Sequence, residues 1–259
     1  MEFIPSSQGL DDLASQVTPG IESSMRGAID GYAIDLLRFV AGSYGAACIE
    51  SAWQEFVFDK GSRFDADDPH HELFFSWLFH CWVPRPQRDG RIDDPALYGR
   101  SPTGAYLRRD SRHLNPLLQR YLAACLEAPL GFYEIIECRP TLGYRARNVS
   151  TGRQIEVSEG LASTTLNVGD IIFARIAFVD GVYLTDSIAP LAFPAEFRKH
   201  FTQGLEPGCL GGSERELRRL YFDLLEAYLC ERLPEVRSGH RGVVERRTLC
   251  ERRPTRRRR

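Results

Sequence analysis

The segment from residue 132 to residue 187 constrains the fold most, because its apolar residues alternate with a period of two over several short runs. Asp180-Gly181, between IAFV and VYLT, has the composition of a two-residue hairpin turn. Ser150-Thr151-Gly152 and Asn167-Val168-Gly169-Asp170 indicate two further turns. Five short strands separated by such turns predict a small barrel of the SH3-like or OB-like kind, or a strongly curled antiparallel sheet.

The Asp180-Gly181 turn also predicts a register for the last two strands. An aromatic pair and a pair of opposite charges then fall directly opposite each other, as cross-strand pairing favours. The predicted ladder pairs Val179 with Val182, Phe178 with Tyr183, Ile176 with Thr185, and Arg175 with Asp186. A register set by the second turn brings Arg145 close to Glu156, so we expect alternating charges on the solvated face of the sheet.

Helical periodicity precedes and follows this β segment. Apolar residues repeat at three and four from about Ser24 to Asp59, with an interruption at Gly42–Gly45. The segment PHHELFFSWLFHCW, with an acidic cap at Asp67-Asp68, is apolar on nearly every face and predicts a centrally buried helix. Further helix starts are marked by Ser101-Pro102, by Asn115-Pro116 and by the capping box Ser213–Glu216.

These patterns together predict an α+β protein with an N-terminal helical bundle, a small barrel and a closing C-terminal helix. The expected divisions are a loose lead-in over 1–20, the bundle over 21–130, the barrel module over 131–190, closing helices over 191–233 and a disordered Arg-rich tail over 234–259.

The composition is that of a water-soluble globular protein, with 43% hydrophobic and 26% charged residues. There is no apolar run near the roughly 20 residues that a membrane helix needs, and the first residues lack the pattern of a secretory signal. We therefore expect a cytoplasmic protein that has no membrane partner.

The charge is unevenly distributed along the chain. From Arg241 onward, nine arginines and two glutamates, Glu245 and Glu251, give residues 241–259 a charge of +7. Because the net charge of the whole chain is −2, residues 1–240 carry −9. Two interpretations of the basic end stay open. It is either a solvated tail with general affinity for nucleic acid, or the product of a shifted reading frame in a GC-rich gene.

Metal-binding residue types are present without metal-binding spacing. The seven cysteines show no C-x-x-C or C-x-C pattern, and most lie beside apolar residues, which favours buried thiols in a reducing compartment. His70 and His71 are adjacent, so on a helix their side chains point about 100° apart, and His80 is too far from His71 to share an ion. No metal ligand and no cofactor is predicted.

Catalytic motifs are not visible in the sequence. It contains no G-x-S-x-G, Walker A or G-x-G-x-x-G pattern. Paired aspartates occur at 11–12, 67–68 and 93–94, where turn and cap roles are more common than acid–base catalysis. A hydrolase or nuclease that uses His70, His71 and nearby aspartates is kept as an alternative function.

A second alternative is nucleic-acid binding by the barrel. Small barrels bind single strands by stacking bases on aromatic side chains beside basic residues, and Arg145, Arg147 and Arg153 lie near Tyr144 in this segment. These four are the candidate binding residues, with or without the basic tail. The predicted acidic partner of Arg145 and the −9 charge of residues 1–240 count against this interpretation.

Several motifs of the chain resemble those of a known group of proteins. FYEIIECRP, VSTGRQIEVSE and GDIIFARIAFVDGVYLTDS, with EFVFD, LFFSWLFHCW and RSPTGAYL upstream, resemble uncharacterised bacterial proteins often associated with the SEC-C zinc-binding motif. The resemblance covers roughly residues 25–233 and implies no established activity. The Cys-rich zinc motif itself is missing, so no metal ligand is carried over. We expect a binding or adaptor protein without a catalytic site, whose main partner is another protein.

Overall fold

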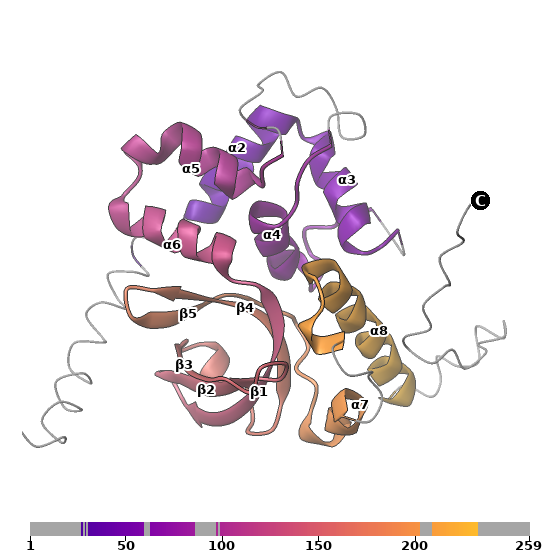
Figure 1. The fold of residues 1–259 in the computed structure, drawn as a ribbon. Helices are drawn as coiled ribbons and strands as arrows, with labels where there is room; N and C mark the ends of the chain where they lie inside the picture. Colours follow the sequence, from indigo (N-terminus) through magenta and orange to yellow (C-terminus); the bar gives the residue numbers. More distant parts are fainter. Residues whose placement is uncertain are drawn as a thin grey trace, which may run out of the picture.

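The computed structural model describes residues 27, 29, 31–59, 63–85, 97, 99–202 and 209–232. The predicted lead-in and the Arg-rich tail lie outside these residues. A group of helices lies over one side of a closed β-barrel, and a long C-terminal helix lies beside both (Figure 1). The predicted α+β fold, with its small barrel and closing helix, is confirmed.

Three helices begin where their predicted capping residues lie. The bounds of the helices are Tyr32–Tyr44 (α2), Ala47–Phe56 (α3), His71–His80 (α4), Pro102–Asp110 (α5), Pro116–Glu127 (α6), Lys199–Thr202 (α7) and Glu214–Arg232 (α8). The side chains of Ser101 and Asn115 accept the N–H groups of Gly104 and Leu117, and Ser213 and Glu216 form the predicted capping box. Among these helices, none is both long and apolar enough to cross a bilayer.

One helix start differs from the prediction. The α4 helix begins at His71, later than a cap at Asp67-Asp68 would give. Asp68 Oδ1 accepts the backbone N–H of His70, and the carbonyl of Asp68 accepts the N–H of His71, which closes a separate turn before the helix. The acidic residue therefore caps a turn, and the helix follows it.

Five strands close into the barrel. They are Leu130–Arg139 (β1), Gly143–Asn148 (β2), Gln154–Ser158 (β3), Ile171–Val179 (β4) and Val182–Ile188 (β5). The order around the barrel is β1-β2-β3-β5-β4, in which β3 and β5 pair in parallel and the other pairs are antiparallel. Closure leaves no free sheet edge within the barrel, so its faces and ends are the parts available to partners.

The β4–β5 hairpin has the predicted turn. Asp180 and Gly181 both have positive φ, 49° and 90°, as a type I′ turn requires. The predicted register is confirmed from the turn up to the Ile176–Thr185 pair.

Beyond that pair the predicted register is wrong. A β-bulge shifts the ladder by one residue, so Arg175 pairs with Ser187, and Asp186 is the extra residue of β5. The bulge turns the Asp186 side chain toward the helices, where Arg175 also points. The expected exposed ion pair is thus a buried one, between side chains that are at most 1% exposed.

Two apolar cores share strand β4. Its even-numbered residues Ile172, Ala174 and Ile176 fill the barrel, and its odd-numbered residues face the core between the barrel and the helices. A strand that is buried on both faces needs a nearly continuous apolar sequence, which explains the run IIFARIAFV. Arg175 is the one charged residue in this run, and its position therefore requires a built partner.

The long helix α8 is fastened to the helical bundle by a buried arginine. Arg218 donates to the backbone carbonyls of Glu55 and Phe56 at the end of α3, and to the carboxylate of Glu214 at 2.9 Å. The guanidinium thereby satisfies carbonyls that have no partner inside their own helix. This confirms that the last helix closes onto the rest of the fold.

Candidate functional site

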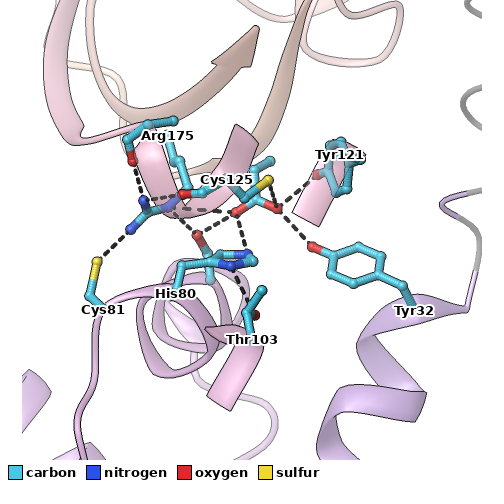
Figure 2. A network of polar contacts seen from close by, with 10 residues as sticks. Tyr32, His80, Cys81, Thr103, Tyr121, Cys125 and Arg175 are labelled. Carbon is cyan, nitrogen blue, oxygen red and sulfur yellow. Dashed lines mark hydrogen bonds and ion pairs between the residues drawn. The ribbon is translucent and has the colours of Figure 1, made fainter. Parts of the chain in front are cut away.

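The most concentrated polar chemistry lies between the helices and the barrel. Figure 2 shows side chains from α2, α4, α6 and the barrel pointing toward one common region, with Tyr32, Tyr121, His80, Cys125 and Arg175 labelled. The carboxylate of Asp186 is the shared partner of these groups. We call this set, together with Ser76, the Asp186 centre.

Neutral donors occupy both oxygens of the Asp186 carboxylate. Oδ1 accepts the hydroxyls of Tyr32 at 2.7 Å and Tyr121 at 2.8 Å, and Oδ2 accepts the hydroxyl of Ser76 at 2.5 Å. Burial, with Asp186 as the next cause, raises the pKa of both tyrosines well above the ordinary value, so they stay protonated donors.

Two basic side chains complete the surroundings of Asp186. His80 Nε2 lies 3.6 Å and Arg175 Nε 3.8 Å from Oδ2. Burial alone would raise the pKa of Asp186, but His80, Arg175 and the Ser76 hydroxyl outweigh it and hold that pKa far below its usual range. The carboxylate is therefore ionised at neutral pH and is balanced by buried positive charge.

Arg175 has its other donors satisfied by the helices. It donates to the backbone carbonyls of Cys125 at 3.0 Å and Ala128, to Ser76 Oγ at 3.0 Å, and to Cys81 Sγ at 2.8 Å. A guanidinium with this many buried partners acts as a polar clamp between β4 and the ends of α4 and α6.

A metal ion fits the Asp186 centre poorly. His80, Cys125 and Asp186 offer ligand atoms within 4.8 Å of one another, and these residue types bind zinc elsewhere. However, the carboxylate already accepts three hydroxyl hydrogen bonds, and burial raises the pKa of Cys125, which disfavours the thiolate that a metal requires. The Arg175 charge beside Oδ2 would also repel a dication.

The same centre is closed to substrates. Thr103 Oγ1 lies 3.1 Å from His80 Nδ1, so Thr103, His80 and Asp186 form a chain with the order of a hydrolase triad. Thr103 is fully buried and His80 is only 5% exposed, so no substrate carbonyl can reach the hydroxyl. The Asp186 centre is therefore suited to holding the helices and the barrel in one arrangement.

The two histidines of the hydrolase alternative are used separately. His70 is placed between Asp68 at 3.1 Å and the Tyr221 hydroxyl at 3.0 Å, whereas His71 contacts the backbone carbonyl of Asp68. Burial lowers the pKa of His70, and its contact with Tyr221 joins α4 to α8. The aspartates at 11–12 and 93–94 lie outside the described residues.

The predicted nucleic-acid residues occupy different environments. Arg145 is 3.1 Å from Glu137, and Arg147 is 2.6 Å from Glu134, so each already has an acidic partner. Tyr144 lies in the barrel core, 2% exposed, and its hydroxyl contacts Thr185 at 2.9 Å. A base would have to displace barrel packing to stack on this ring.

The fourth candidate, Arg153, is exposed and contacts Tyr183 of strand β5. Its Nη2 donates to the Tyr183 hydroxyl at 2.6 Å, and its Cζ is 5.7 Å from the centre of that ring. The ring centres of Tyr183 and Phe178 are 4.6 Å apart, and Phe178 is 54% exposed. We call Arg153, Phe178 and Tyr183 the barrel-end surface.

Strand geometry explains why Phe178 is exposed here, beside the half-buried Tyr183. Phe178 continues the row of barrel-filling residues Ile172, Ala174 and Ile176, but it lies next to the hairpin turn, past the last fully covered layer. The Phe178 side chain therefore projects beyond the barrel core, and the ring of its cross-strand partner Tyr183 packs against one side of it.

Comparisons with protein-family models, with curated proteins and with solved structures found no match. The resemblance to SEC-C-associated proteins therefore stays a prediction.

The sequence patterns predicted neither the exposure of Phe178 nor the Asp186 centre. The pairing of Phe178 with Tyr183 was expected, but their exposure depends on where the barrel ends. The Asp186 centre depends on the β-bulge, for which the sequence carries no clear signal. A charged residue in the middle of the doubly buried run IIFARIAFV was the available indication, because such a residue must meet a partner inside the protein.

Proposed function

We propose that this protein is a non-catalytic, cytoplasmic binding or adaptor protein that recognises another protein through the barrel-end surface. The observation that carries the proposal is the exposure of Phe178, an aromatic residue of strand β4 that packs on Tyr183, which in turn binds Arg153. Aromatic residues and arginine are the residue types that dominate binding energy at protein interfaces. The free thiols of the described cysteines agree with a reducing compartment.

Burial of the Phe178 ring against a partner would supply part of the binding free energy. Covering the exposed half of a phenylalanine removes on the order of 100 Å² of apolar area from water, which is worth about 2–3 kcal/mol. Phe178 and Tyr183 are already fixed by cross-strand packing, so little side-chain entropy is lost on binding.

The charge distribution favours a protein over a nucleic acid as the partner. Glu134 and Glu137 neutralise Arg147 and Arg145, so the predicted basic face of the barrel has little net attraction for phosphates. An enzyme is less well supported, because the chain with triad order is sealed from solvent.

The test compares proteins captured by tagged wild type and two variants in quantitative affinity purification. Phe178→Ser removes the exposed ring, and Leu161→Ser is the matched control, because Leu161 is 81% exposed and lies in the loop before β4. We expect at least one protein to be kept by wild type and Leu161→Ser but lost by Phe178→Ser. That protein, once purified, should bind Phe178→Ser at least about tenfold more weakly. If Phe178→Ser captures every protein that wild type and Leu161→Ser capture, and in equal amounts, the proposal is refuted.

A further inference from the structure

Arg153 differs from the arginines of β1 and β2. Arg139, Arg145 and Arg147 each form a salt bridge with a glutamate. Arg153 forms none with any residue that the structure describes, and within that part of the chain its guanidinium hydrogen-bonds to the neutral Tyr183 hydroxyl. The barrel-end surface thus carries one positive charge that the described fold leaves unbalanced.

The acidic residue of the β4–β5 turn is already paired. Asp180, in the β4–β5 turn, accepts two hydrogen bonds from Arg120 Nε, at 3.0 and 2.9 Å, and Arg120 Nη2 also lies 2.9 Å from it. This ion pair fastens the hairpin turn to α6. It leaves Arg153 as the positive group that contacts Tyr183, the cross-strand partner of the exposed Phe178.

The Arg153 guanidinium is oriented by Tyr183 and keeps N–H groups that can bind a ligand. The hydrogen bond to Tyr183 uses one of the N–H groups of Arg153 and places Cζ over the ring at 5.7 Å. The remaining N–H donors of an exposed arginine form a planar fork that matches the two oxygens of a carboxylate.

We propose that the barrel-end surface binds a peptide segment in which an apolar or aromatic side chain packs on Phe178 and a nearby carboxylate pairs with Arg153. This inference rests on the proposed function and names the chemistry of its partner. Neither feature suffices alone, because an exposed ion pair is weak and a single ring gives little specificity.

A carboxylate suits this surface better than a nucleic-acid strand does. Binding a strand requires several cations along the backbone, since each phosphate carries a charge. The barrel-end surface offers a single unpaired arginine, while Glu134 and Glu137 hold the neighbouring basic residues. One cation next to one aromatic platform matches one acidic residue next to one apolar residue.

The experiment screens an immobilised library of seven-residue peptides that carry Phe, Leu, Trp or Tyr two positions before Asp or Glu. The second arm is the same library with Asn and Gln in place of the acids. The third is single-stranded dT12 and rU12. Affinities of selected probes are then measured by fluorescence anisotropy for wild type, Arg153→Gln, Phe178→Ser and Arg147→Gln. The last variant removes the same charge from an ion-paired position of the barrel.

We expect acidic peptides to bind wild type and Arg147→Gln equally, and Arg153→Gln at least about threefold more weakly. The Asn and Gln peptides should show the same loss with wild type. Thermal unfolding close to that of wild type would show that Arg153→Gln is folded, as expected for an exposed side chain.

Three results would overturn the inference. They are the selection of no acidic peptide, equal binding by Arg153→Gln, and binding of dT12 or rU12 in preference to peptides. Equal binding by Arg153→Gln together with loss in Phe178→Ser would leave the proposed protein-binding function standing and remove only the carboxylate.

Discussion

Replacing Asp186 with asparagine tests whether the Asp186 centre holds the fold together. The substitution keeps the size of the side chain and an oxygen for the tyrosine hydroxyls, but it removes the charge that balances Arg175. Arg175 is 1% exposed and cannot recover water. Breaking a buried ion pair in this way costs about 3–5 kcal/mol of unfolding free energy. For a chain of this size that corresponds to a fall in Tm of roughly 10 °C.

The assay is urea unfolding at neutral pH, followed by far-ultraviolet circular dichroism. Asp180→Asn is the matched control, because the Asp180–Arg120 pair is exposed and should contribute less than about 1 kcal/mol. Asparagine also tolerates the positive φ of this turn residue. A loss of less than about 1 kcal/mol for Asp186→Asn, or a loss equal to that of the control, would show that the charge balance described here is incorrect.

A double-mutant cycle sharpens this test. Arg175→Met alone leaves the Asp186 carboxylate without its arginine, and the double variant removes both charges together. Because the two side chains share one buried site, the double variant should be more stable than the sum of the single losses predicts, by about 2 kcal/mol. Additivity within about 0.5 kcal/mol would mean that the two groups act independently.

Three further outcomes follow from the described contacts. The folded-state pKa of Asp186 is depressed below its unfolded value of about 4, so the ionised carboxylate stabilises the fold at neutral pH and this stabilisation is lost as the pH falls below about 4. The urea midpoint of wild type should therefore decrease more steeply toward about pH 2.5 than the urea midpoint of Asp186→Asn. Arg218→Met leaves the carbonyls of Glu55 and Phe56 without their donor and should lower the free energy of chemical unfolding by about 2–4 kcal/mol. The control is Arg219→Met, at an exposed neighbouring position, and a loss above about 1 kcal/mol in this variant would contradict the assigned role of Arg218. Gly143→Ala places a Cβ 2.1 Å from the Val157 carbonyl oxygen at φ 152°, so it should destabilise the barrel by more than about 2 kcal/mol. Gly152→Ala, where φ is 73° and the Cβ meets no neighbour, should cost about 1 kcal/mol. Similar Tm values for the two variants would disprove the close approach of β2 and β3.

Features that depend on neighbouring residues could be predicted from the sequence. The Asp180-Gly181 turn has the required positive φ values, and the capping residues Ser101, Asn115 and Ser213 lie where their helices begin. Each of these depends on a few residues whose backbone preferences agree with the final fold. The overall α+β arrangement followed from the order of such elements.

Features that depend on distant residues could not be predicted. The bulge at Asp186 forms where β5 meets partners from α2, α4 and α6, which are up to 154 residues away in the chain. Local pairing rules favoured the regular register because they cannot include these partners. The exposure of Phe178 was likewise hidden, since it depends on how far the closed barrel covers its own strands.

The Asp186 centre also has a consequence for how the chain folds. All five strands lie within one continuous stretch, so hairpins can form early from local contacts, with Asp186 and Arg175 still hydrated. Docking of the helices strips water from both charges, and a partly docked state would bear that desolvation without its compensating bonds. Such a state should be sparsely populated, and the helices and the barrel should then melt as one cooperative unit despite their separation along the sequence.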